Sequence, residues 1–72
     1  MASLTPAQYD ALERAVTDRG RIAVVRRGTE FVVIAEALLL DGGRERIRSF
    51  HPSTGQPLIF FIDEVDSIQV IP

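Results

Sequence analysis

Turn-forming residues interrupt this sequence at short intervals, and their spacing limits the fold more than any other feature. They occur at Gly20, at Gly28-Thr29, in the DGG of residues 41–43, in the HPSTGQP of residues 51–57 and in the polar DEVDS of residues 63–67. Glycine supplies positive φ angles, proline fixes φ and removes a backbone donor, and short polar side chains bond to nearby backbone. The segments between these turns leave room for one helix and several short strands.

The segment before Gly20 predicts one amphipathic helix over residues 6–18. Thr5 is a typical N-cap residue, Pro6 suits the first helical position, and Gln8 completes a capping box with Thr5. Apolar side chains recur on one face at helical spacing, while charged ones occupy the opposite face. Gly20 is the expected stop of this helix. Because a helix of this length is marginal alone, we expect it to lie against the rest of the chain.

After Gly20 the pattern becomes β-rich. The predicted strands are residues 21–27, 30–40, 44–50, 58–62 and 68–71. The second segment also permits a buried helix, since Ala, Glu and Leu dominate its end, but its β-branched and aromatic start favours a long, bent strand. One helix followed by five strands on nearest-neighbour connections predicts an α+β, mainly β fold. We expect an antiparallel meander that closes into a small barrel.

The chain of 72 residues predicts a single domain over residues 1–72. It has no cysteine and one histidine, which excludes disulfides, thiolate zinc sites and His-rich metal sites. We therefore expect no metal and no cofactor. A core this small supplies only about 3–5 kcal/mol of net stability, so good local geometry or self-association is expected to contribute.

No apolar run approaches the length of a membrane span, and the N-terminus lacks the basic-then-apolar pattern of a signal peptide. The cytoplasm is the expected compartment, with no membrane partner. A net charge of −2 gives no global attraction to nucleic acid or to anionic lipid.

Catalysis is not expected. A nucleophilic site would need His51 with a nearby serine and an orienting carboxylate. His51 directly precedes Pro52 in a loop, where a supported geometry is hard to build, and Asp63 and Asp66 fall in a polar turn. No glycine-rich phosphate-loop motif is present.

The strand at residues 44–50 carries the candidate site. Its alternation places Arg44, Arg46, Arg48 and Phe50 on one side and Ile47 on the other, facing the core. The arginines are then spaced about 7 Å apart, near the phosphate repeat of a single strand, and an adjacent aromatic ring can stack on a base. The candidate binding residues are Arg44, Arg46, Arg48, Phe50, His51, Arg26 and Arg27.

Simpler interpretations stay open for this strand. Charges on an exposed strand block unwanted edge pairing, and Glu30 or Glu36 on a neighbouring strand could neutralise the arginines in place. All eight cations are arginine, which is typical of a GC-rich genome but also of bidentate contacts with phosphate or carboxylate. The large apolar side chains exceed what one face of a five-stranded sheet needs, which indicates either a tightly filled barrel or an oligomer.

The order of elements resembles the Sm-like small barrels of the SH3-like class. In that family an N-terminal helix caps an open barrel, and a short helical turn precedes the last strand, as DEVDS precedes IQVI (residues 68–71) here. The family's uridine pocket does not carry over, because Ile62-Asp63 stands where the family has Arg-Gly after the fourth strand. The chain is also similar to the Rho-binding antiterminator group, small acidic Sm-like proteins that bind a transcription factor instead of RNA.

We therefore expect a non-enzymatic small barrel that binds single-stranded nucleic acid, or a protein of the transcription or RNA machinery, through its arginine-lined strand. The alternative is a protein-interaction or regulatory module. It would act by pairing an edge strand such as residues 68–71 with a neighbour, or by homo-oligomerisation.

Overall fold

The structure is a computed structural model that describes residues 4–72. Its elements are, in chain order, α1 (Pro6–Asp18), β1 (Arg21–Arg26), β2 (Thr29–Asp41), β3 (Arg44–Phe50), β4 (Pro57–Phe61), the single 3-10 turn η1 (Ile62–Glu64) and β5 (Ser67–Ile71). The predicted bounds of the helix and of β3 are confirmed. Those of the other strands differ by one residue at one or both ends.

Helix α1 begins as its sequence predicts. The Thr5 backbone N–H donates to Gln8 Oε1 at 2.8 Å, and the Gln8 N–H donates to Thr5 Oγ1 at 3.2 Å, which completes the capping box. Leu12 and Ala15 are buried against the sheet. The Tyr9 hydroxyl donates to the Glu45 carboxylate of β3 at 2.6 Å, and this hydrogen bond raises the pKa of Tyr9. The helix is thus attached to the sheet by an apolar face and one polar contact.

The left-handed residue that ends the helix lies one position before the expected stop at Gly20. Arg19, not Gly20, adopts the left-handed conformation, with φ of 55°. The Gly20 N–H donates back to the Ala15 carbonyl at 2.7 Å, which satisfies one of the last free carbonyls of the helix. Gly20 is therefore the link into β1, and the reversal of direction is made at Arg19.

The five strands form one antiparallel sheet in the order β4-β3-β2-β1-β5. The predicted nearest-neighbour order is right for β1 to β4 and wrong for β5, which pairs with β1. The physical reason lies in β1, where Ile22, Ala23 and Val24 are all buried. Such a strand needs partners along both edges, and β5 supplies the second. Because β4 and β5 lie at opposite edges and do not pair with each other, the sheet described by residues 4–72 is open.

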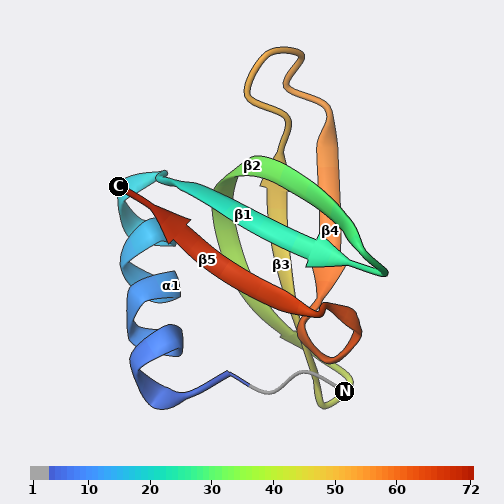
Figure 1. The fold of residues 1–72 in the computed structure, drawn as a ribbon. Coiled ribbons are helices and arrows are strands. Elements are labelled where there is room, and N and C mark those ends of the chain that lie inside the picture. The colour runs from blue at the N-terminus through green and yellow to red at the C-terminus, as the bar shows by residue number, and fades with distance from the viewer. Residues whose placement is uncertain (1–3) are drawn as a thin grey trace.

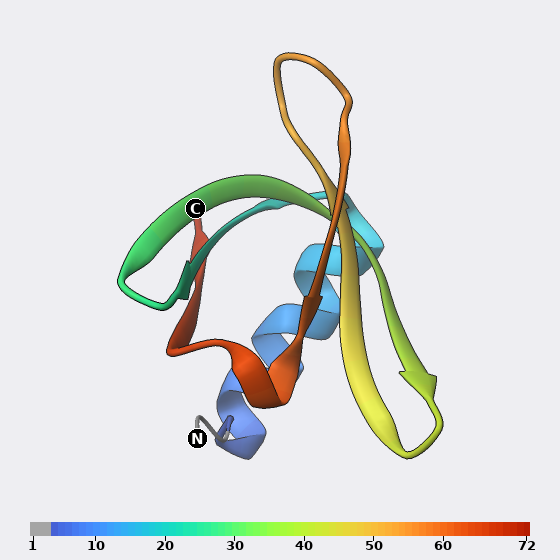
Figure 2. The same ribbon diagram turned by 90° about the vertical axis from the view of Figure 1, so that its right-hand side faces the viewer.

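Strand β2 is shared between two layers. Its first half pairs with β1 and its second half with β3, and a β-bulge at Glu36 shifts the β2–β3 register between Ala35 and Ala37. The bulge bends β2 into the arch seen in Figure 2. This confirms the prediction of one long, bent strand. In Figure 1, β1 and β5 cross in front of β3 and β4, and α1 lies beside them.

The core lies between these layers and under α1. Side chains from every layer meet in one apolar cluster. Its largest fully buried members are Phe60, Leu12, Ile22, Ile47, Val24, Val33 and Val65. No helix within residues 4–72 is long and apolar enough to cross a membrane.

The turn between β1 and β2 differs from the prediction that Arg27 ends the strand. Arg27 and Gly28 occupy the two central positions of the turn, with φ of 52° and 78°. Two successive positive φ values define a type I′ turn, in which Asn or Gly is favoured at both positions. Arginine at the first of them holds a backbone conformation that its Cβ disfavours.

We predict that Arg27→Asn stabilises the protein. Asparagine tolerates the left-handed region, so relief of the strain at this position is expected to add about 1 kcal/mol to the free energy of unfolding. For a domain of this size that corresponds to a rise in Tm of about 4–8 °C, measurable by circular dichroism. Arg21→Asn, an exposed substitution on ordinary extended backbone, is the control. An equal or larger gain from the control would contradict the role given to backbone strain.

Candidate functional site

Strand β3 presents its arginines as the alternation predicts. Ile47 and Ser49 are buried, and the Ser49 hydroxyl donates to the Leu58 carbonyl of β4 at 2.8 Å. Arg44, Arg46 and Arg48 project from the opposite side of the strand, and we call these three side chains the arginine face. Across the sheet they are flanked by apolar residues of β2 and β4. In register, Leu39 and Phe61 lie opposite Arg46, and Ala37 and Ile59 lie opposite Arg48.

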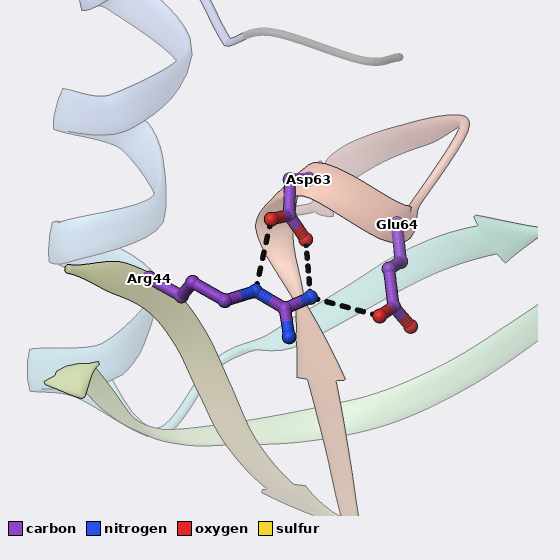
Figure 3. Close-up of polar contacts among 3 residues, drawn as sticks. All are labelled: Arg44, Asp63 and Glu64. Atoms are coloured by element: carbon purple, nitrogen blue, oxygen red, sulfur yellow. Dashed lines mark hydrogen bonds and ion pairs between the residues drawn. The ribbon is translucent and has the colours of Figure 1, made fainter. Parts of the chain in front are cut away.

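Arg44 is held by two carboxylates of η1. Its Nε and Nη2 atoms donate to the two oxygens of Asp63 at 3.0 and 2.8 Å, and Nη2 also contacts Glu64 Oε2 at 2.8 Å (Figure 3). The guanidinium carbon lies 4.0 Å from the centre of the Phe61 ring. This bidentate geometry, with an aromatic ring beneath the cation, fixes the orientation of the side chain.

The contact changes the protonation equilibria of both partners. Hydrogen bonds from Arg44 to the ionised form lower the pKa of Asp63, and the same bonds, together with those to Glu64, raise the pKa of Arg44. Because the folded-state pKa of Asp63 is depressed, its contribution to stability is present above the ordinary carboxyl pKa. It is lost as the pH falls through the lowered value.

The other two arginines of the face are also paired. Arg48 Nε donates to Glu36 Oε1 at 2.6 Å, and Glu36 Oε2 lies 3.5 Å from Nη1 of Arg19 at the end of α1. Arg46 Nη1 lies 3.5 Å from Asp41 Oδ2. Arg46 Nε is the one buried side-chain nitrogen or oxygen within residues 4–72 that has no hydrogen-bond partner.

The arginine face is therefore compensated within the chain. Together with Arg19, its three guanidinium groups meet four carboxylates. The interpretation in which Glu36 neutralises the strand is confirmed, whereas Glu30 lies on β2 opposite Val25 of β1, away from β3. A phosphate approaching this face would compete with a carboxylate at each arginine.

Phe50 and His51, predicted at the rim of the site, have different roles. Phe50 is half-buried and lies in register with Ile34 of β2 and Pro57 of β4, at the far end of β3 from Arg44. His51 is exposed, and its Nδ1 accepts the backbone N–H groups of Ser53 and Thr54 at 3.1 and 3.4 Å. The histidine therefore shapes the loop between β3 and β4.

Arg26 and Arg27 do not extend the arginine face. Arg26 points to the inner side of β1, where its guanidinium carbon lies 5.3 Å from the centre of the Phe31 ring and 5.1 Å from that of Phe60. Arg27 lies in the β1–β2 turn. A pocket of about 380 Å³, which we call the turn pocket, is lined by Arg26, Arg27, Thr29, Phe31 and Glu64. Sequence reasoning named both arginines but not this pocket, because it depends on the return of η1 beside the turn.

Within residues 4–72, no group of three or more His, Asp or Glu side chains is arranged to hold a metal ion. A scan of the chain against protein-family models finds no match, and a search of the curated proteins finds none either.

We predict that Arg44→Gln returns the pKa of Asp63 toward its ordinary value of 3.8. Removing the guanidinium removes the hydrogen bonds that favour the ionised carboxylate. Titration of the Asp63 side-chain carboxyl carbon by NMR measures this directly. Arg46→Gln removes a neighbouring charge without touching Asp63, so that variant is expected to keep the lowered pKa. An unchanged Asp63 titration in Arg44→Gln would show that the contact in Figure 3 is not formed in solution.

Proposed function

We propose that this chain is a non-enzymatic binding module that pairs the free edges of its sheet with another polypeptide, the simplest partner being a second copy of itself. The observation that carries this proposal is the open sheet, in which β4 and β5 each have a strand on one side only. A free edge presents unpaired backbone N–H and C=O groups, and these are a template for an added strand.

The sequences of the two edges support this proposal. Natural edge strands are usually protected by charges, yet neither β4 (PLIFF) nor β5 (SIQVI) contains a charged residue. On β4, the Ile59 side chain is 45% exposed. An apolar side chain left in water on an edge strand without charges is typical of a strand that is covered in its working state.

The β5 edge offers a second attachment point. A pocket of about 140 Å³ lies where α1 approaches this strand. Its lining residues are Leu4, Gln8, Ala11, Ile68, Gln69 and Val70. In strand addition, main-chain hydrogen bonds provide affinity and such pockets select every second side chain of the incoming strand. A partner strand along β5 would therefore be bound by main-chain hydrogen bonds, and one of its apolar side chains would occupy this pocket.

Pairing of β4 with β5 between copies would be head-to-tail, since the two edges differ. Such an interface closes into a ring if its rotation permits, and otherwise extends into a filament. The proposal includes the finer fold expected from the Sm-like resemblance, a partly open barrel of the SH3-like class. The bend of β2, the pairing of β5 with β1 and the short helical turn before the last strand support it.

We predict that the mass in solution exceeds the 8.0 kDa of one chain at micromolar concentration. Light scattering coupled to size-exclusion chromatography measures it. Ile59→Lys places a charge on the β4 edge and is expected to return the protein to the monomer mass. Leu40→Lys is the matched control, because Leu40 is 73% exposed and lies on β2, outside the two strands whose pairing is proposed.

Two results of this mass measurement would contradict the proposal. A wild-type chain that stays at the monomer mass across the concentration range contradicts self-association. Loss of assembly in Leu40→Lys to the same degree as in Ile59→Lys would show that added charge, and not the edge, is responsible.

We propose binding of single-stranded nucleic acid, or of an acidic surface on a protein of the transcription or RNA machinery, as a second candidate. The observation in its favour is that Arg44, Arg46 and Arg48 share one side of β3, with Phe61 beneath Arg44. The ion pairs to Asp41, Glu36 and the η1 carboxylates weigh against it, because these carboxylates repel a phosphate and compete with it for the guanidinium groups.

A salt titration tests this second candidate. If the arginine face binds a single-stranded oligonucleotide, log affinity falls against log salt with a slope of roughly −0.7 for each phosphate neutralised. Arg46→Glu is expected to flatten that slope, while Arg14→Glu on the exposed side of α1 leaves it unchanged. Absence of any binding at low salt, measured by fluorescence anisotropy, would remove nucleic acid as a partner of this face.

A further inference from the structure

The turn pocket contains Arg26 and Arg27, two of the four arginines of residues 4–72 that form no ion pair. Arg26 extends the inner row of β1 formed by the buried Ile22 and Val24, so its side chain closes one end of the core. There it lies over Phe31 and Phe60, whose ring centres are 5.3 Å apart. The two rings are tilted by 54° to each other, and cation–π attraction to both favours this position of the guanidinium.

The guanidinium N–H groups of Arg26 have no acceptor within residues 4–72. Four of the eight arginines form ion pairs, whereas neither Arg26 nor Arg27 has a carboxylate within 4.0 Å or a side-chain hydrogen bond. The donors of Arg26 are not buried, so they are accessible to an anion from solution. The two adjacent cations therefore form a place where an anion would be stabilised.

The one acidic group of the pocket is directed elsewhere. Glu64 lines the turn pocket, but its Oε2 contacts Arg44 at 2.8 Å, as Figure 3 shows. Arg44 therefore pairs with Glu64 as well as with Asp63, and neither Arg26 nor Arg27 is paired with a carboxylate. The Thr29 hydroxyl adds a neutral donor at the same rim.

The turn that carries Arg27 is fixed in place. The Gly28 N–H donates to Asp66 Oδ2 at 3.1 Å, and the Asp66 N–H donates to the Val25 carbonyl at 2.6 Å. Arg27 itself holds a positive φ that arginine disfavours. A strained residue that the surrounding hydrogen bonds hold in position is a feature of ligand sites, because strain is retained where the side chain is useful.

We propose that the turn pocket binds a phosphate monoester group, with Arg26 and Arg27 as its two cationic contacts and Thr29 as a neutral donor. Two guanidinium groups match the double charge of a phosphate monoester, whereas one alone satisfies a carboxylate. A volume of about 380 Å³ admits the phosphate and part of the small molecule that carries it. None of the lining residues belongs to β4 or β5, so this proposal does not rest on the pairing proposed above.

NMR titration of the wild-type chain tests the proposal, with inorganic phosphate, a sugar monophosphate and a nucleoside monophosphate as probes. We expect saturable shifts at the amides of Arg27 and Thr29 and at the Arg26 Nε–H with all three probes. A tighter response to the nucleotide than to the sugar phosphate would show that the base also contacts the pocket. Equal responses would show recognition of the phosphate alone. Either result supports a phosphate site.

Two variants make the test specific. Arg27→Asn is expected to fold better than wild type and to bind each probe about tenfold more weakly, since it loses one charge-assisted contact. Arg26→Lys keeps the charge but loses the planar fork, and a similar loss is expected. Arg14→Gln removes a charge far from the pocket and is expected to bind as wild type does. Shifts that never saturate, or an equal loss in Arg14→Gln, would overturn the proposal.

Discussion

The bend of β2 is the constraint on which the rest of the molecule depends. One strand of 13 residues pairs with β1 through its first half and with β3 through its second, and the bulge at Glu36 turns one layer onto the other. A bulge leaves backbone groups without ladder partners. Here the Ala35 N–H donates to the Gly20 carbonyl at 2.9 Å, so the link between α1 and β1 stabilises the bend. The apolar faces of both layers can then share one core.

The same bulge determines the electrostatics of the surface. Glu36, the extra residue, is directed to Arg48 of β3 and to Arg19 at the end of α1. With Asp41 and the η1 carboxylates, it converts a strand that looks strongly basic in the sequence into a compensated surface. The uncompensated features of the structure are instead the two edges of the sheet and the turn pocket. This redistribution is why we favour strand pairing over phosphate contacts along β3.

Features set by neighbours in the sequence were predictable. The capping box at Thr5 and Gln8 fixed the start of α1, and the alternation around Ile47 fixed the orientation of β3. Contacts between segments that are distant in the sequence could not be predicted. The Arg44–Asp63 pair spans 19 residues, and the pairing of β5 with β1 depends on how the bent sheet returns. Glu36 was recognised as one neutralising neighbour because it belongs to the adjacent strand.

The central claim is that β4 and β5 are covered by another polypeptide in the working state, and amide hydrogen exchange at several protein concentrations tests it most directly. Amides of β1, which pairs with β2 along one edge and with β5 along the other, are expected to exchange slowly at every concentration. Amides of β4 and β5 that face outward are expected to exchange fast in dilute solution and to become protected as the protein is concentrated. Exchange at both edges that stays fast and independent of concentration would contradict the account for self-pairing.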